Sequence, residues 1–173
     1  MPLNDQRLVR VGKACAGIIQ SWKEGVDLQQ QSGKPIDDLC LEVASGRWRL
    51  AYDMRAAANG CLARKVPLVR DAISRYYYAL YHAMRAAAFV YHQGDDHESH
   101  KALPGKVPVD FPNHPYWSNQ LKSARDYRNR ADYDPYPRGT RHWHPIAVLL
   151  KSDADKLLPA ARTYLIGKGC PLR

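Results

Sequence analysis

Apolar residues recur every three or four positions along most of this 173-residue chain, which is the spacing of helices with one apolar face. The first such series comprises Leu8, Val11, Cys15, Ile18 and Trp22. It predicts an amphipathic helix that ends near Gly25, before the polar stretch 29–33.

A second, shorter helix is expected to start at Pro35, because proline is favoured in the first turn of a helix. The small residues Ser45 and Gly46 are expected to end it. Residues 1–45 are therefore predicted to form an N-terminal helical extension.

The rest of the chain, residues 46–173, is predicted to form a helical bundle. Its expected helices cover residues 48–64, 67–92 and 117–133, with a last one from Pro145 onward, and a loop rich in proline and glycine over 93–116. The helix over 67–92 would span roughly 38 Å, which makes it the expected central element. Pro159 is expected to kink or split the last helix. No segment alternates with a period of two for long enough to be a strand, so the predicted fold class is all-α, with four to five helices around a long central one.

Composition bears on compartment and partners more than on fold. The four cysteines show neither metal-ligand spacing nor a disulfide pattern, which predicts reduced thiols in a cytoplasmic protein. The longest apolar run, 86–91, is far shorter than the roughly 20 residues that cross a bilayer, so no membrane contact is expected. A net charge of +9 favours a polyanion such as RNA, or an acidic partner protein.

The long helix has two different faces. Its expected core stripe contains Val69, Ile73, Tyr76, Leu80, Ala83, Met84, Ala87 and Tyr91, and its opposite face contains Arg75, Tyr78, His82, Arg85, Phe89 and His92. Solvated helix faces usually carry Glu and Lys, whereas Arg, His and Tyr suit phosphate contacts, base stacking or a packed polar interface. The predicted RNA- or partner-binding residues are Arg75, Tyr78, His82 and Arg85, together with His100 and Arg125 from the following segments.

The next helix has an arginine on its apolar side. Its inward face is defined by Trp117, Leu121, Ala124 and Ala131. Arg128 falls in the middle of that face, where a charge is costly unless it is paired or used. Two alternatives remain open: an ion pair with Asp132, four residues later in the same helix, or an anion held by Arg128 in a groove.

Histidines are the other candidate groups. His97 and His100 flank Glu98 in an acidic loop, which is a weak pattern for a metal site, and no metal is expected. His142 and His144 are candidates for a general acid or base, or for a phosphate contact.

Three motifs, in the expected order, resemble the HEPN superfamily of RNA-associated helical domains. Residues 74–83 contain a Tyr-Tyr-Ala-Leu-Tyr-His run similar to the signature of the family's second helix, and residues 99–101 resemble its His-Lys step. Residues 128–133 resemble the Arg-x-x-Ala-Asp-Tyr motif of one HEPN branch. The resemblance covers about residues 46–166.

This resemblance implies a bundle of four or five helices that pairs as a homodimer. Many HEPN members are metal-independent ribonucleases, acting as toxins or in antiviral defence, and use an arginine, a polar residue and a histidine four to six residues after the arginine. Arg128 and Asn129 match the first half of that motif, and Tyr133 stands where the histidine is expected. The implied catalytic candidates are Arg128, Asn129, Asp132 and Tyr133, with no cofactor.

Two functions remain open from the sequence. The first is an RNA-targeting ribonuclease, and the second is a non-catalytic HEPN module that binds a partner protein, a nucleotide or RNA. In some toxin pairs of the family, a nucleotidyltransferase antitoxin modifies a tyrosine beside the motif, and Tyr133 and Tyr136 occupy comparable positions.

Overall fold

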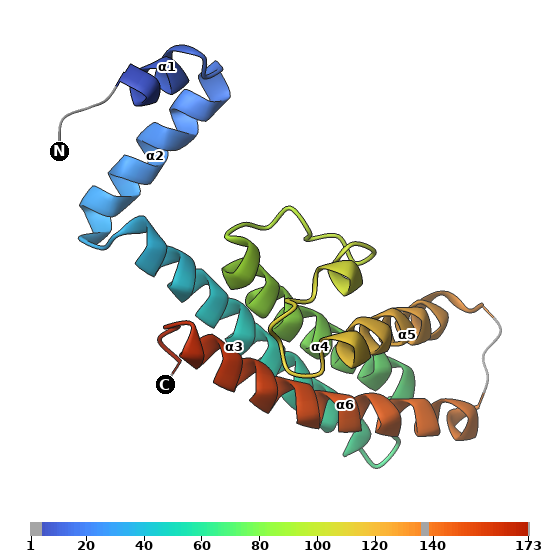
Figure 1. The fold of residues 1–173 in the computed structure, drawn as a ribbon. Coiled ribbons are helices and arrows are strands. Elements are labelled where there is room, and N and C mark those ends of the chain that lie inside the picture. Colours follow the sequence, from blue (N-terminus) through green and yellow to red (C-terminus); the bar gives the residue numbers. More distant parts are fainter. Residues whose placement is uncertain (1–4, 136–138, 173) are drawn as a thin grey trace. The chain divides into compact units, whose positions relative to one another are not determined.

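The computed structural model describes residues 5–135 and 139–172, and all regular structure in these two ranges is helical (Figure 1). The predicted all-α bundle is therefore confirmed. The chain divides into two compact units at the bond between Cys40 and Leu41. Within the described ranges, no helix is both long and apolar enough to cross a bilayer.

The first unit contains α1 (Asp5–Gly12) and α2 (Ala16–Ser32). The prediction of a single helix that ends near Gly25 is thus wrong in two respects. The first helix ends at Gly12, and α2 continues for seven residues beyond Gly25. Gln29, Gln30 and Gln31 extend α2 because glutamine is a good helix former. The helix ends at Gly33, whose left-handed φ of 66° is accessible to glycine without strain.

One continuous helix, α3 (Ile36–Leu62), replaces the two that the sequence predicts on either side of Ser45 and Gly46. Ser45 is buried, and its hydroxyl donates to the carbonyl of Leu41 at 2.9 Å, so its side chain does not compete with the helix. Ala44 and Ala51 are also buried along this helix. Burial of small residues therefore outweighs the roughly 1 kcal/mol by which glycine weakens a helix.

The central helix of the second unit is α4 (Val69–His92), which packs against α5 (His114–Tyr133) and α6 (Thr140–Gly167) (Figure 1). Ala51 and Ala58 of α3 belong to the same core. The predicted core stripe of α4 is buried except for Tyr91, which is exposed. The apolar face predicted for α5 is buried throughout.

Prolines lie inside the helices that they were expected to limit. The predicted start of α5 at Trp117 is three residues late, because Pro115 occupies the first turn, where its missing N–H costs nothing. The last helix likewise begins before Pro145, and Pro159 does not split it. Leu157, Leu158 and Ala161 around that proline are fully buried, so core packing offsets the lost hydrogen bond.

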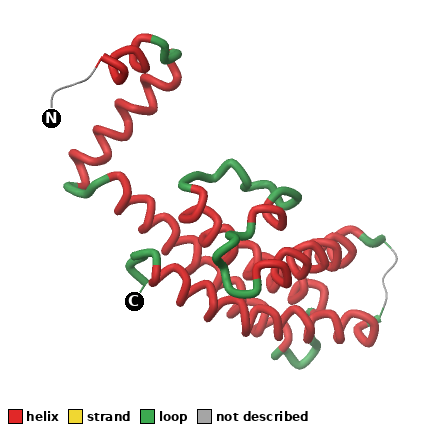
Figure 2. Tube along the Cα trace, viewed as in Figure 1, coloured by secondary structure: helices red, strands yellow, loops and turns green. Residues whose placement is uncertain are grey.

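A long connection between α4 and α5, interrupted only by the short 3₁₀ helix η1 (Leu103–Lys106), folds back beside these helices (Figure 2). This confirms the predicted loop. Ser118 of α5 donates to the Pro104 carbonyl at 2.6 Å and fixes the loop to that helix. At the other end of α5, Arg70 of α4 donates to the carbonyls of Ala131 (2.5 Å) and Asp134 (3.0 Å), which satisfies groups that the helix end leaves free.

Candidate functional site

Side chains from α4, α5 and the 93–102 loop meet in one group, which we call the Tyr–His–Arg cluster. Its members are Tyr77, Tyr78, Tyr81, His82, His100 and Arg128. Tyr78 connects the cluster, because its ring lies near His82 (6.1 Å between ring centres) and His100 (5.8 Å) while its hydroxyl meets Arg128.

Arg128 is held on several sides. Its Nη2 donates to the Tyr78 hydroxyl at 2.8 Å, and its guanidinium lies 5.3 Å from the centre of the Tyr78 ring and 5.4 Å from that of Tyr133. The predicted ion pair with Asp132 is present, with 2.6 Å between Nε and Oδ2. The Nε proton is not directed at that oxygen, so this contact is an ion pair without a well-aligned hydrogen bond.

The side-chain amide of Asn129 stands beside this guanidinium. The Nη1 of Arg128 donates to the side-chain oxygen of Asn129 at 3.2 Å, and Asn129 is exposed. Tyr133 is 70% exposed next to them. The outer edge of the cluster thus presents one arginine, one amide and one largely exposed aromatic ring to the surroundings.

His100 enters the cluster from the loop. Its Nδ1 lies 2.7 Å from the Tyr77 hydroxyl, and its ring centre is 4.3 Å from that of Tyr81. Burial lowers the pKa of His100, and the nearby Arg128, Arg85 and Arg125 lower it further. Burial also raises the pKa of Tyr77. Tyr77 therefore keeps its proton and can donate it to Nδ1 of a neutral His100, which places the ring proton on Nε2.

His82 is the more deeply buried imidazole. Burial, together with Arg85 and His100, lowers the pKa of His82 to about 4. Its Nδ1 is buried without a hydrogen-bond partner. Both histidines of the cluster are therefore neutral at pH 7, and the positive charge there comes from arginine.

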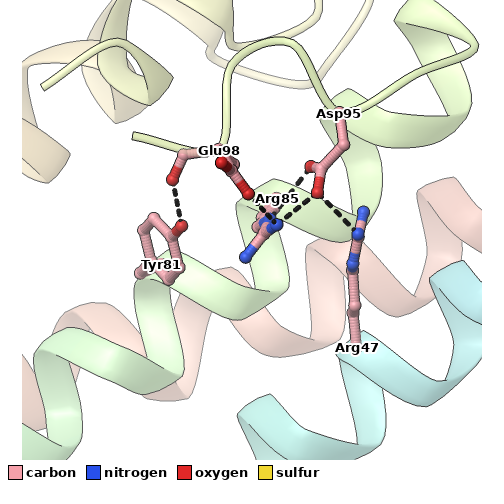
Figure 3. Close-up of polar contacts among 5 residues, drawn as sticks. All are labelled: Arg47, Tyr81, Arg85, Asp95 and Glu98. Carbon is pink, nitrogen blue, oxygen red and sulfur yellow. Dashed lines mark hydrogen bonds and ion pairs between the residues drawn. The ribbon is translucent and has the colours of Figure 1, made fainter. Parts of the chain in front are cut away.

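A salt-bridge network, the Asp95 clamp, fixes the loop that supplies His100 (Figure 3). Arg85 of α4 forks onto both oxygens of Asp95, with its Nε donating at 2.9 Å, and Arg47 of α3 reaches the same carboxylate at 2.7 Å. Tyr81 donates to the Glu98 carbonyl two residues before His100. These contacts give the loop one position relative to α4.

The structure brings most of the predicted binding residues together. Tyr78, His82 and His100 are in the cluster, Arg85 borders it in the clamp, and Arg125 lies close enough to lower the pKa of His100. Arg75 is elsewhere, because its guanidinium contacts the sulfur of Met54 on α3 at 3.7 Å. Tyr136 lies outside the described residues.

Several contributors were missed from the sequence. Tyr77 and Tyr81 belong to the tyrosine run, and their spacing of four residues places them on one face of α4, which is the signal that could have found them. Asp95 and Arg47 had no such signal, because they come from segments 48 residues apart.

The arrangement suits anion binding better than proton transfer. Arginine keeps its charge at any physiological pH, and two neutral imidazoles with lowered pKa values are poor proton donors at pH 7. In the described part of the chain, no three His, Cys, Asp or Glu side chains are grouped so that they could hold a metal ion.

Comparisons with known proteins add no further assignment. A scan against protein-family models, a search of curated proteins and a search of solved structures each found no match.

Proposed function

We propose that this protein is a HEPN-type RNA-targeting protein that binds single-stranded RNA at the end of α5. The observation that supports it is the fixed orientation of Arg128, whose Nη1 stands beside the amide of exposed Asn129 while its other nitrogens contact Asp132 and Tyr78. A phosphate can accept hydrogen bonds from the guanidinium and the amide together, and charge-assisted bonds of this kind are strong.

The surroundings of Arg128 favour RNA over a small anion. The exposed ring of Tyr133 offers a surface on which an unpaired base can stack. Residues 1–40 contain five basic and five acidic residues, so the whole net charge of +9 lies in residues 41–173 with the cluster. Such a charge attracts a polyanion over a longer range than one arginine can.

Binding is tested by fluorescence anisotropy with a labelled single-stranded RNA at 50 and 200 mM salt. Arg128→Ala is expected to weaken binding about tenfold, because it removes one charged phosphate contact, and Arg128→Lys should weaken it less. Arg10→Ala is the matched control, since it removes the same charge from an exposed position in the other unit. Equal weakening by the Arg10 and Arg128 variants, or no binding by the wild type at 50 mM salt, would refute the proposal.

RNA cleavage is the second candidate function, and the presence of His100 in the cluster favours it. Cleavage through the 2′-hydroxyl needs a proton acceptor and a proton donor besides a cation. The wild type, Arg128→Ala and His100→Gln proteins are incubated with total RNA and with tRNAs in the presence of a chelator. Fragments that only the wild type produces support a metal-independent ribonuclease, whereas binding without cleavage supports the non-catalytic alternative.

The resemblance also supports two partners as proposals: a second copy of the chain and a nucleotidyltransferase antitoxin. Tyr133 is the accessible candidate for modification, because its side chain is largely exposed. A nucleotide added to that hydroxyl would place negative charge next to Arg128 and would compete with RNA for it.

A further inference from the structure

A pocket of about 600 Å³ lies between the start of α5 and the middle of α6, separate from the Tyr–His–Arg cluster. Its volume is in the range of small-molecule sites. The lining residues are Pro112, Asn113, Tyr116, Trp117, Lys156 and Ala160. The rings of Tyr116 and Trp117 are edge-to-face with their centres 4.9 Å apart, so one wall of the pocket is aromatic.

A buried carboxylate adjoins this wall. Asp153 is 2% exposed, and its Oδ1 accepts a hydrogen bond from the Tyr116 hydroxyl at 3.2 Å, whereas its Oδ2 is buried without a partner. A buried carboxylate oxygen that lacks a donor costs stability, which is typical of sites where a ligand supplies the donor. Burial also raises the pKa of Asp153, so a positively charged donor would favour its ionised form.

Tyr116 connects the pocket with this carboxylate. Its ring lines the pocket and is 42% exposed, and its hydroxyl makes one hydrogen bond, to Asp153. That bond, at 3.2 Å, is longer than the roughly 2.7–2.8 Å usual for a hydroxyl donor. A charged donor forms a shorter and stronger bond to a carboxylate, so an ammonium group in the pocket can displace the Tyr116 hydroxyl from Asp153.

A lysine without a counter-ion lies on the same face of α6. Lys156 follows Asp153 by three residues and Ala160 follows Lys156 by four, so the three share one side of the helix. Lys156 is exposed, and none of the ion pairs among the residues that the structure describes includes it. The pocket therefore offers a ligand one negative and one positive group, about one helical turn apart.

We propose that this pocket binds a free α-amino acid with an aromatic side chain. The ammonium group of the amino acid donates to Asp153 in place of the Tyr116 hydroxyl, its carboxylate pairs with Lys156, and its ring packs against Trp117. A simple amine would be repelled by Lys156 and a simple acid by Asp153, whereas an α-amino acid carries both charges on one carbon. The proposal does not depend on RNA binding at Arg128, which lies roughly 16 Å further along α5 than Trp117.

The test is isothermal titration calorimetry of the full-length protein at pH 7 with L-phenylalanine. A dissociation constant of about 1 mM or lower is expected for a ligand of this size. Three related compounds each lack one group: N-acetyl-phenylalanine lacks the ammonium, phenethylamine the carboxylate and alanine the ring. Each should bind at least about tenfold more weakly. No binding of phenylalanine at about 10 mM overturns the proposal, and so does equal binding of any of the three.

Protein variants locate the site. Asp153→Asn keeps the size of the side chain and should weaken phenylalanine binding about tenfold or more, because the charged acceptor is lost. Lys156→Gln should weaken it several-fold, whereas Lys122→Gln, the same change at an exposed position of α5, is the matched control. Tyr116→Phe should tighten binding, because the ring stays while the competing hydroxyl is removed.

A thermal shift completes the experiment, since a ligand that binds only the native state raises Tm. Phenylalanine should raise the Tm of the wild type and leave that of Asp153→Asn unchanged. Full affinity in Asp153→Asn overturns the proposal, as does equal affinity of the Lys156 and Lys122 variants. Weaker binding by Tyr116→Phe overturns it too, because the hydroxyl would then hold the ligand and not compete with it.

Discussion

Replacing Asp95 by asparagine should destabilise this protein by about 2 kcal/mol, although the side chain keeps its size. Asp95 is the only carboxylate that both Arg47 and Arg85 contact among the ion pairs of the described residues. Its removal takes the facing negative charge from two arginines that are only 18–20% exposed, and leaves Arg85 with the exposed carboxylate of Glu98.

The magnitude follows from the contacts. A hydrogen bond to a charged group contributes about 1.5–3 kcal/mol, and breaking a buried ion pair costs about 3–5 kcal/mol. Asp95 is 25% exposed and asparagine can still accept from one arginine, so solvent and the remaining bond reduce the loss to about 2 kcal/mol. For a chain of this size that corresponds to a decrease in Tm of about 4–8 °C.

The assay is urea unfolding followed by tryptophan fluorescence, with Asp96→Asn as the matched control. Asp96 is exposed and next in sequence, so the same chemical change there should alter the free energy of unfolding by less than about 0.5 kcal/mol. The hydrogen bond from Arg85 holds the pKa of Asp95 below its usual range. Its stabilisation is therefore present above the unfolded-state pKa near 3.9 and is lost as the pH falls through the lower native value.

The difference between wild type and Asp95→Asn should accordingly be largest at pH 6–7 and should shrink below about pH 4. Equal unfolding midpoints for the Asp95 and Asp96 variants at pH 7 would refute the reasoning. A difference that stays constant down to pH 3 would show that the loss comes from shape and not from charge.

Two further predictions concern single positions in α6 and α3. Asp153 is 2% exposed, and its carboxylate accepts one hydrogen bond from Tyr116 while its Oδ2 is buried without a partner. Burial raises the pKa of Asp153. Ionisation of Asp153 therefore lowers the free energy of unfolding as the pH rises. Asp153→Asn should therefore gain stability relative to wild type, on the order of 1 kcal/mol, between pH 3 and pH 7, and a pH-independent difference in urea unfolding would contradict this. Gly46→Ala should raise the free energy of unfolding by about 0.5–1 kcal/mol, because the added Cβ meets nothing within 4 Å inside α3. A loss of stability in thermal unfolding would mean that residue 46 ends a helix after all.

Periodicity was sufficient to predict the helices whose apolar faces enter the core. The apolar stripe of α4 and the inward face of α5 lie where a 3.6-residue repeat places them, apart from Tyr91. The predicted helix ends at Ser45-Gly46 and at Pro159 were wrong, because the preference of serine, glycine and proline against helix is a local effect. Buried neighbours that lie far away in the sequence outweighed a cost of about 1–3 kcal/mol at each position.

The cluster was predictable only within single helices. The ion pair between Arg128 and Asp132 follows from their spacing of four residues. The bond between Tyr77 and His100 does not, because the 93–102 loop has no repeat that indicates where it folds back. The position of the Arg70 side chain at the end of α5 could not be predicted either, because its two acceptors are backbone carbonyls that any residue could supply.

The continuity of α3 across the boundary between Cys40 and Leu41 has a consequence for amide hydrogen exchange. Amides near the buried residues Ala51 and Ala58 should exchange only through global unfolding, whereas those of the first turn should exchange by local fraying, at rates many times faster. A single uninterrupted helix would then show a steep gradient of protection along its length. A protease should cut at the fast end first and release residues 41–173 as the resistant fragment.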